Sequence, residues 1–259
     1  MVLAKSSIQE LLLKYRPSTN SLKGKVVLVT GANRGLGRAV SRAAADAGAE
    51  TIVLGRNVKE LERLADEIED AGLAAPSVIP ADLEGATVDD YAMLAELIHE
   101  RYGRLDGLVL NAGILGEMAP LASYDPVTWA RVFQVNVHSQ FLLVQATLPL
   151  LQRGDSSIIF TSSGVGRKSR AYWGAYAAAK FATEGMMQTL ADELADQNKV
   201  RVNAINPGRL RTKMRAEAYP AEDPLTLLRP SEITHAYLFL LGADGRDAHG
   251  LSLDAQLPK

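Results

Sequence analysis

Residues 25–37 read KVVLVTGANRGLG, and this stretch decides the fold of the chain. The apolar run KVVLV is typical of a strand buried in a parallel sheet. Gly31, Gly35 and Gly37 follow it with the spacing G-x-x-x-G-x-G, where the strand turns into a helix. Backbone without Cβ lets a phosphate come close, and the first turn of the helix offers unpaired N–H groups to that anion. The stretch therefore predicts the first βαβ unit of a dinucleotide-binding fold, rather than a tight turn with a purely structural role.

Short apolar runs alternate with helical patterns along the rest of the chain. The predicted strands lie near residues 25–30, 50–54, 76–80, 107–111, 157–161, 200–205 and 250–253. The predicted helices lie near residues 35–47, 57–71, 87–102, 125–152, 173–198 and 231–241. This alternation implies right-handed crossovers and a parallel sheet with helices on both faces. We therefore expect an α/β fold in which residues 23–259 form one dinucleotide-binding and catalytic domain.

Two segments lie outside this alternation. Residues 1–22 form an N-terminal arm, and Pro17 is expected to end its helix. The apolar residues at helical spacing in the arm are Ile8, Leu11, Leu12 and Tyr15. They predict one stripe packed on the body of the domain. Residues 212–230 show no clear period, and a loop of this length is more often a substrate lid than a simple connection.

Composition limits the possible functions. The chain has 259 residues, a net charge of -2 and 47% hydrophobic residues, which is ordinary for one globular domain and gives no general attraction to nucleic acid or membrane. It has no cysteines, and its four histidines lack metal-ligand spacing, so we expect no metal site. The first residues do not fit a signal peptide, and the cytoplasm is the expected compartment.

The end of the second predicted strand indicates the nicotinamide cofactor. An acidic residue there would bind the ribose 2′-hydroxyl of NAD, but this chain has Gly55 and then Arg56. Arg34 lies within the glycine turn. Two guanidinium groups suit a 2′-phosphate, so the pattern favours NADP(H) over NAD(H). The alternative is that Arg56 is a solvated residue at the start of the next helix, which would leave selectivity low.

A second motif, YAAAK, places Tyr176 and Lys180 one helical turn apart, and Ser163 follows the predicted strand 157–161. Tyrosine titrates near pH 10, and a neighbouring ammonium favours its phenolate, so we expect Lys180 to lower the pKa of Tyr176. Ser163 would hydrogen-bond a carbonyl oxygen as negative charge develops on it. Alone, such a pair is often a surface feature of a helix. With the glycine turn, the set predicts hydride transfer between a nicotinamide and a carbonyl or secondary alcohol.

At these residues the chain resembles the short-chain dehydrogenase/reductase superfamily, in its compact single-domain branch. The motifs that carry the resemblance are TGANRGLG at 30–37, ADL at 81–83, NAG at 111–113, VNV at 135–137, YAAAK at 176–180 and NPG at 206–208. The resemblance covers about residues 23–255. It implies a doubly wound Rossmann fold whose seven-stranded, mostly parallel sheet has the order 3-2-1-4-5-6-7. Longer segments such as WGAYAAAKFATEGMMQ at 173–188 are similar to the YciK-like bacterial oxidoreductases.

The resemblance also assigns residues to roles. It implies that Ser163, Tyr176 and Lys180 are catalytic and that Asn136 anchors a proton-relay water. The implied cofactor-binding residues are Gly31, Asn33, Arg34, Gly35, Leu36, Gly37, Arg56, Asp82, Leu83, Asn111, Ala112, Gly113, Tyr176, Lys180, Pro207, Gly208 and Thr212. Among these, Asp82 would meet the adenine. Two positions depart from the usual pattern: Leu110 precedes Asn111, and Asp254-Ala255-Gln256 replaces Asp-Gly-Gly, which puts a common tetramer contact in doubt.

The substrate is less constrained than the cofactor. Seven cations are expected near the cleft: Arg167, Lys168, Arg170, Arg209, Arg211, Lys213 and Arg215. They suit an anionic substrate, such as an acyl group on a carrier protein or CoA, or form a solvated rim with partners such as Glu217 and Glu222. The alternatives to a general carbonyl reductase are therefore a 3-oxoacyl reductase and a non-catalytic NADP(H)-binding sensor or scaffold. The resemblance implies a homodimer or homotetramer.

Overall fold

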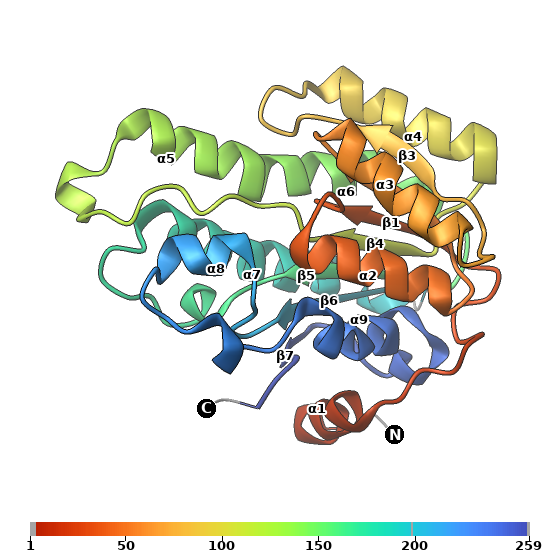
Figure 1. Ribbon diagram of the computed structural model, residues 1–259. Coiled ribbons are helices and arrows are strands. Elements are labelled where there is room, and N and C mark those ends of the chain that lie inside the picture. The colour runs from red at the N-terminus through yellow and green to blue at the C-terminus, as the bar shows by residue number, and fades with distance from the viewer. Residues whose placement is uncertain (1–3, 198, 258–259) are drawn as a thin grey trace.

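The computed structural model describes residues 4–197 and 199–257, and its centre is one sheet of seven parallel strands (Figure 1). The strand order is β3-β2-β1-β4-β5-β6-β7, as predicted. The strands are β1 (Val26–Thr30), β2 (Glu50–Gly55), β3 (Ser77–Pro80), β4 (Gly107–Leu110), β5 (Ser156–Thr161), β6 (Val200–Asn206) and β7 (Leu251–Asp254). The order reverses between β1 and β4, which is where open parallel sheets bind ligands.

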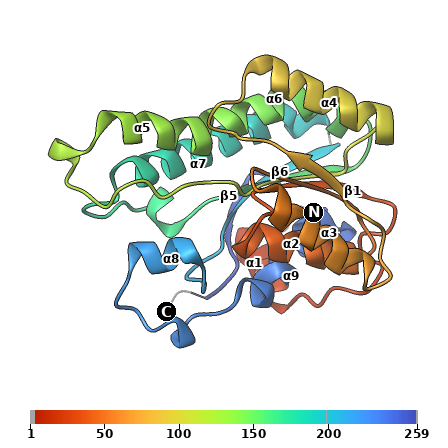
Figure 2. The same cartoon turned by 45° about the horizontal axis from the view of Figure 1, so that its top comes forward.

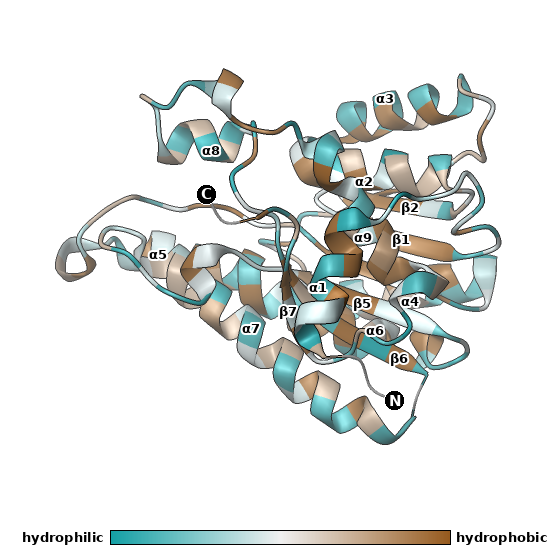
Figure 3. Cartoon of the chain, turned by 90° about the horizontal axis from the view of Figure 1, so that it is seen from below, coloured by the Kyte–Doolittle hydropathy of each residue, from teal (hydrophilic) through white to brown (hydrophobic). Residues whose placement is uncertain are grey.

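Helices cover both faces of the sheet. They are α1 (Lys5–Lys14), α2 (Gly35–Asp46), α3 (Val58–Glu69), α4 (Val88–Tyr102), α5 (Pro126–Phe133), α6 (Ser139–Leu151), α7 (Gly174–Leu194), α8 (Lys213–Ala218) and α9 (Thr234–Leu241). Figure 2 shows α4, α6 and α7 on one side of the sheet and α1, α2, α3 and α9 on the other. The strands carry mostly hydrophobic residues, which colour much of the centre of Figure 3 brown.

Strand β1 shows how the two cores are separated. Val27 and Val29 are fully buried among the side chains of α2 and α9, whereas Leu28 is buried among those of α4, α6 and α7. Successive side chains of a strand point to opposite faces, so a continuous apolar run is needed when both faces are covered. The doubly wound arrangement therefore follows directly from the run KVVLV.

Polar residues fix where several helices begin. The side chains of Asn57, Thr87 and Asp125 each accept a hydrogen bond from a backbone N–H in the first turn of α3, α4 and α5, respectively. The Asp90 carboxylate accepts a hydrogen bond from the backbone N–H of Thr87 and completes a capping box. Gly103, with φ of 68°, ends α4. These caps account for the close agreement between predicted and observed helix starts.

The predicted helix at 125–152 has an unbroken helical backbone but is not α-helical throughout. A π-helical turn at Gln134–His138 separates α5 from α6, and Asn136 lies within it. Such turns widen the helix by one residue and occur often at functional sites. The periodicity of the sequence gives no signal for one extra residue in a single helical turn. A regular α-helix was therefore expected over the whole range.

The N-terminal arm forms helix α1 and lies beside α9 and β7, which come last in the chain (Figure 1). Ile8 and Leu12 are buried, and the ring of Tyr15 packs edge-on against Phe239 at 5.5 Å. The expectation that Leu11 belongs to this stripe is wrong, because its side chain is 49% exposed. Successive residues of a helix are about 100° apart, so Leu11 lies at the margin of a stripe centred between Ile8 and Leu12.

The segment 212–230 has more regular structure than expected. It contains the short helix α8 and a 3-10 turn at Pro224–Thr226. Thr212 begins α8 by accepting a hydrogen bond from the backbone N–H of Arg215 at 3.2 Å. Helix α8 has only six residues, which are too few to give a helical period in the sequence. A loop was therefore predicted for this segment.

Candidate active site

The turn after β1 has little room for side chains. Gly31 and Gly35 have φ of +69° and +58°, which favour glycine. A Cβ at Gly37 would lie 2.3 Å from the carbonyl oxygen of Gly31. Glycine at these positions lets the backbone pass close to the start of α2, where the N–H groups of the first turn are free to bind an anion. The turn therefore fits the pyrophosphate of a dinucleotide.

The two predicted phosphate-binding arginines lie on segments that touch each other. The Asn33 side chain donates a hydrogen bond to the carbonyl oxygen of Asn57 at 2.7 Å, and these residues are the neighbours of Arg34 and Arg56. Both guanidinium groups are exposed and make no hydrogen bond or ion pair with any residue that the structure describes. They are available for an anion such as the 2′-phosphate of NADP(H).

Thr30 fixes the segment after β4 beside the glycine turn, a role that sequence reasoning missed. Its hydroxyl accepts hydrogen bonds from the backbone N–H groups of Asn111 and Ala112, both at 3.0 Å. The Asn111 side chain returns a hydrogen bond to the Thr30 carbonyl at 3.0 Å. Just after β3, Leu83 is buried and Asp82 is exposed. The adenine contact of Asp82 stays a prediction. The predicted cofactor residues of these strands thus share one edge of the sheet.

The segment after β6 reaches the same edge. Gly208 has φ of +74°, and Gln256 donates hydrogen bonds to the carbonyl oxygens of Pro207 at 2.7 Å and Arg209 at 3.1 Å. Thr212 lies against the glycine turn, because a Cβ on Gly35 would be 3.6 Å from its methyl group. Gln256 therefore supports this turn, although the sequence marked it only as a departure from a family pattern.

Three consecutive residues at the carboxyl end of β5 face three turns of α7. The carbonyl oxygen of Thr161 accepts a hydrogen bond from Lys180 Nζ at 2.6 Å. Next to it, Ser162 Oγ donates to Glu184 Oε1 at 2.5 Å. Ser163 then lies close enough to the Tyr176 phenol for its hydroxyl to lower the pKa of that group. The predicted catalytic serine, tyrosine and lysine are thus brought together, and the Lys180 ammonium lies 5.6 Å from the Tyr176 ring centroid.

Burial controls the protonation of this group. It raises the pKa of Tyr176 to about 12, and the hydrogen bond from Ser163 only partly opposes the rise. Burial also lowers the pKa of Lys180 to about 8, against the attraction of Glu184. The expected lowering of the Tyr176 pKa is therefore wrong for the chain's own groups, because burial makes the charged phenolate costly and this cost decides the direction of the shift. The phenol keeps its proton at neutral pH.

Asn136 holds the segment after β4 in place. Its side chain is fully buried in the π-helical turn, where Oδ1 accepts a hydrogen bond from the backbone N–H of Ile114 at 2.8 Å. Its Nδ2 donates to the carbonyl oxygen of the same residue at 2.9 Å. The Asn136 amide therefore satisfies both backbone groups of Ile114, as the backbone of a neighbouring strand would. The role of Asn136 in anchoring a water stays a prediction.

Aromatic side chains cover Tyr176. The ring of Trp173 lies 5.7 Å from that of Tyr176 and 5.9 Å from that of Tyr219, which follows α8. Met214 and Ala218 of α8 pack against the same cluster. The segment predicted to be a lid thus contacts the residues around the phenol.

Most of the seven predicted cations have partners within the chain. Arg167 binds Glu184 and Asp254 and is not at the rim. Four others are held by acidic side chains or carbonyl oxygens of the lid: Arg209, Arg211, Lys213 and Arg215. Lys168 and Arg170 are exposed and make no ion pair with any described residue. The pattern therefore matches the predicted solvated rim at four of the seven positions, Arg209, Arg211, Lys213 and Arg215.

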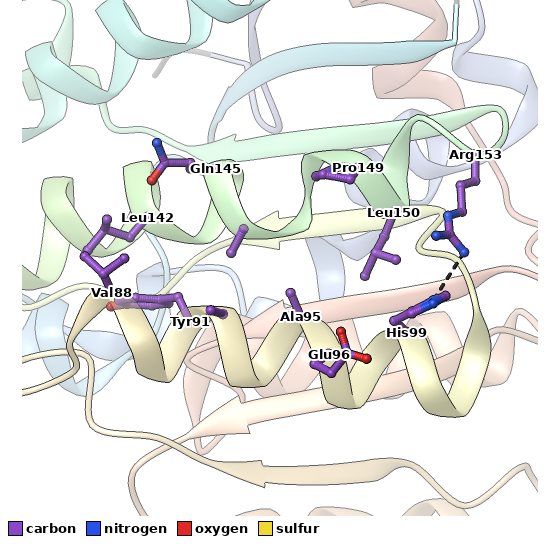
Figure 4. A pocket seen from close by; sticks show the side chains of 12 residues that line it. Val88, Tyr91, Ala95, Glu96, His99, Leu142, Gln145, Pro149, Leu150 and Arg153 are labelled. Carbon is purple, nitrogen blue, oxygen red and sulfur yellow. Dashed lines mark hydrogen bonds between the residues drawn. The ribbon is translucent and has the colours of Figure 1, made fainter.

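A groove of about 380 Å³ lies away from this site, between α4 and α6 (Figure 4). Its lining includes Tyr91, Leu142 and Pro149, and Arg153 contacts His99 at 3.2 Å. No residue of the predicted site lines it. Within residues 4–197 and 199–257, no cluster of three His, Asp or Glu side chains could hold a metal ion. In the same part of the chain, no helix is both long and apolar enough to cross a membrane.

Comparison with known proteins agrees with this geometry. The family model for short chain dehydrogenase matches residues 25–223. The uncharacterized oxidoreductase YciK of Escherichia coli strain K12 is 47% identical over 245 residues, which are 94% of this chain and 96% of that protein. A short chain dehydrogenase of Pseudomonas syringae has a TM-score of 0.92 at 49% identity, covering 94% of this chain and 99% of that one. Another, from Escherichia coli CFT073 in complex with NADPH, has a TM-score of 0.90 at 49% identity, covering 93% of this chain and 100% of that one. The predicted resemblance is confirmed.

Proposed function

This chain belongs to the short chain dehydrogenase family of oxidoreductases, and from that premise we propose that it transfers a hydride between NADP(H) and a carbonyl or secondary alcohol. One observation carries the proposal. The Tyr176 phenol, the Ser163 hydroxyl and the Lys180 ammonium meet at the same sheet edge as the glycine turn. This arrangement can supply a proton to an oxygen next to a bound nicotinamide.

NADPH supplies the hydride when it is bound. Tyr176, which keeps its proton at neutral pH, donates that proton to the substrate oxygen as it gains negative charge. Ser163 donates a hydrogen bond to the same oxygen. Lys180 holds the ribose and carries the positive charge that favours the transient phenolate. Asn136 is a positioning residue, since it fixes Ile114 after β4.

The cofactor preference rests on Arg34 and Arg56. Both guanidinium groups are exposed without protein partners, next to the contact between Asn33 and Asn57. The NADPH complex of the 49% identical relative supports the same preference. The remaining contacts would come from the cofactor residues predicted above. A thermal-shift comparison tests this, because NADPH should raise the melting temperature more than NADH at equal concentration.

The surroundings of Tyr176 favour a substrate with an apolar or aromatic part, since the Trp173 ring packs beside Tyr176 and the Tyr219 ring packs beside Trp173. Lys168 and Arg170 are the two cations free to attract an anionic tail, as in a 3-oxoacyl thioester. Rates with an anionic and a neutral ketone across ionic strength separate these substrates, because only steering by charge is screened by salt. We also propose a homodimer or homotetramer, for which the exposed Phe141 and Phe181 offer an apolar face.

A further inference from the structure

Glu184 lies on the same face of α7 as the proposed catalytic residues. Tyr176, Lys180 and Glu184 are spaced at i, i+4 and i+8, so their side chains form one row along the helix. Tyr176 faces Ser163, Lys180 bonds to Thr161, and Glu184 bonds to Ser162. Glu184 is therefore the third member of a row of which only two members have a proposed role.

The carboxylate of Glu184 is buried, with only 6% of the residue exposed. Its Oε1 accepts hydrogen bonds from Ser162 Oγ at 2.5 Å and from Ser252 Oγ at 2.9 Å. The Arg167 guanidinium approaches it at 3.4 Å but makes its shorter ion pair, at 2.8 Å, with Asp254. A buried charge is costly unless hydrogen bonds and an opposite charge compensate it. Because Arg167 is shared with Asp254, part of the Glu184 charge is left to act on its other neighbours.

Lys180 is the buried cation one turn away on the same helix. Its ammonium points to the Thr161 carbonyl rather than to Glu184, so the two groups interact through space. Burial lowers the pKa of Lys180, and the charge of Glu184 raises it again. The other groups that face Glu184 are Arg167 and, through it, Asp254. Among these, Glu184 is the group whose charge favours the ammonium form.

We propose that Glu184 is a positioning residue of this active site, whose buried carboxylate fixes Ser162, and with it the adjoining Ser163, and stabilises the positive charge of Lys180 one helical turn away. This inference rests on the function proposed above, in which the Lys180 ammonium holds the cofactor ribose. A residue that merely packed the β7 edge against α7 would stabilise the fold without affecting the protonation of Lys180. The two roles differ in how cofactor binding depends on pH.

The test is to titrate the full-length chain with NADPH between pH 7 and 9.5, following nucleotide fluorescence. We expect affinity to fall as Lys180 loses its proton, and Lys180→Met should remove this fall. Glu184→Gln keeps the size of the side chain but removes its charge, and should move the fall to lower pH by roughly one unit. Glu193→Gln, the same change at an exposed residue of α7, should leave it in place.

Two further variants keep the test decisive. Glu184→Asp retains a carboxylate and should restore the fall toward its original pH. Arg167→Met removes the cation that competes for Glu184, so the fall in NADPH affinity should move to higher pH. A variant that only loosened the packing would not be expected to shift the fall in this direction. The inference would be overturned if Glu184→Gln lost NADPH affinity at the same pH as wild type. It would also be overturned if the wild-type loss of affinity with pH were absent, or persisted in Lys180→Met. If the wild-type chain binds no NADPH at all, the proposed function itself fails.

Discussion

The cofactor side and the catalytic side of this site are built in different ways. The cofactor side is made of backbone: glycines at 31, 35 and 37, free N–H groups at the start of α2, and two exposed arginines. The catalytic side is made of buried polar side chains, with Lys180 only 3% exposed and Tyr176 9% exposed. The cofactor side depends on the absence of side chains at the glycines, which leaves room for the nucleotide. The catalytic side depends on the burial of its polar groups away from water. Substitutions should therefore fail differently on the two sides.

The largest effect is expected from Tyr176→Phe on the catalytic side. Loss of the phenolic proton should reduce the rate of carbonyl reduction by about 10³-fold, within the range typical of general acids. NADPH affinity should stay within a few-fold of wild type, because the ring and its packing remain. Steady-state rates and a fluorescence titration measure the two quantities. Equal rates for variant and wild type would remove Tyr176 from the mechanism.

Gly37→Ala should produce the reverse pattern. A Cβ at this position would be 2.3 Å from the Gly31 carbonyl, so the turn must move and NADPH affinity should fall by roughly 100-fold. Gly85→Ala is the matched control, since nothing lies within 4 Å of the added methyl. Isothermal titration with NADPH compares the two. Tight binding by Gly37→Ala would mean that the cofactor side does not depend on this close approach.

Removing the charge of the exposed arginines should have a smaller and more selective effect. A hydrogen bond to a charged group contributes about 1.5–3 kcal/mol, so Arg34→Ala and Arg56→Ala should each weaken NADPH binding by roughly 10- to 100-fold. NADH has no 2′-phosphate, and its affinity should change little. Parallel titrations with the two nucleotides measure the difference. An equal loss for both would show that the arginines do not read the 2′-phosphate.

The smallest effect is one of stability, and its sign is opposite to that of most core substitutions. Burial lowers the pKa of Lys180 from 10.5 to about 8, so below pH 8 folding carries the cost of a buried charge. Lys180→Met should remove that cost and stabilise the fold by about 1–3 kcal/mol at pH 7. The gain should shrink as pH rises from about 8 to 10.5, where native lysine is neutral and unfolded lysine is still charged. Urea denaturation at pH 7 and 9.5 measures this.

The contrast between the two sides also explains what could be predicted from sequence. The glycine turn, the strands and the pair Tyr176 and Lys180 are encoded by local spacing, and the structure contains them where they were expected. The direction of the Tyr176 pKa shift was not predictable, because it depends on burial by residues far away in the sequence, such as Leu115, which belongs to the same buried cluster. Thr30 and Gln256 were missed for a similar reason, since their hydrogen-bond partners lie far away in the sequence, in the segments after β4 and β6.

The side chain of Gln9 has a consequence for how the sheet ends. Its amide accepts a hydrogen bond from the backbone N–H of Asp254 at 2.8 Å and donates one to the carbonyl of the same residue at 2.7 Å. It thus satisfies, from a helix, the two groups that an outermost strand would otherwise offer to a foreign chain. Gln9 thus caps Asp254 of the edge strand β7. Removing the N-terminal helix would expose these two backbone groups and make the β7 edge more prone to aggregation.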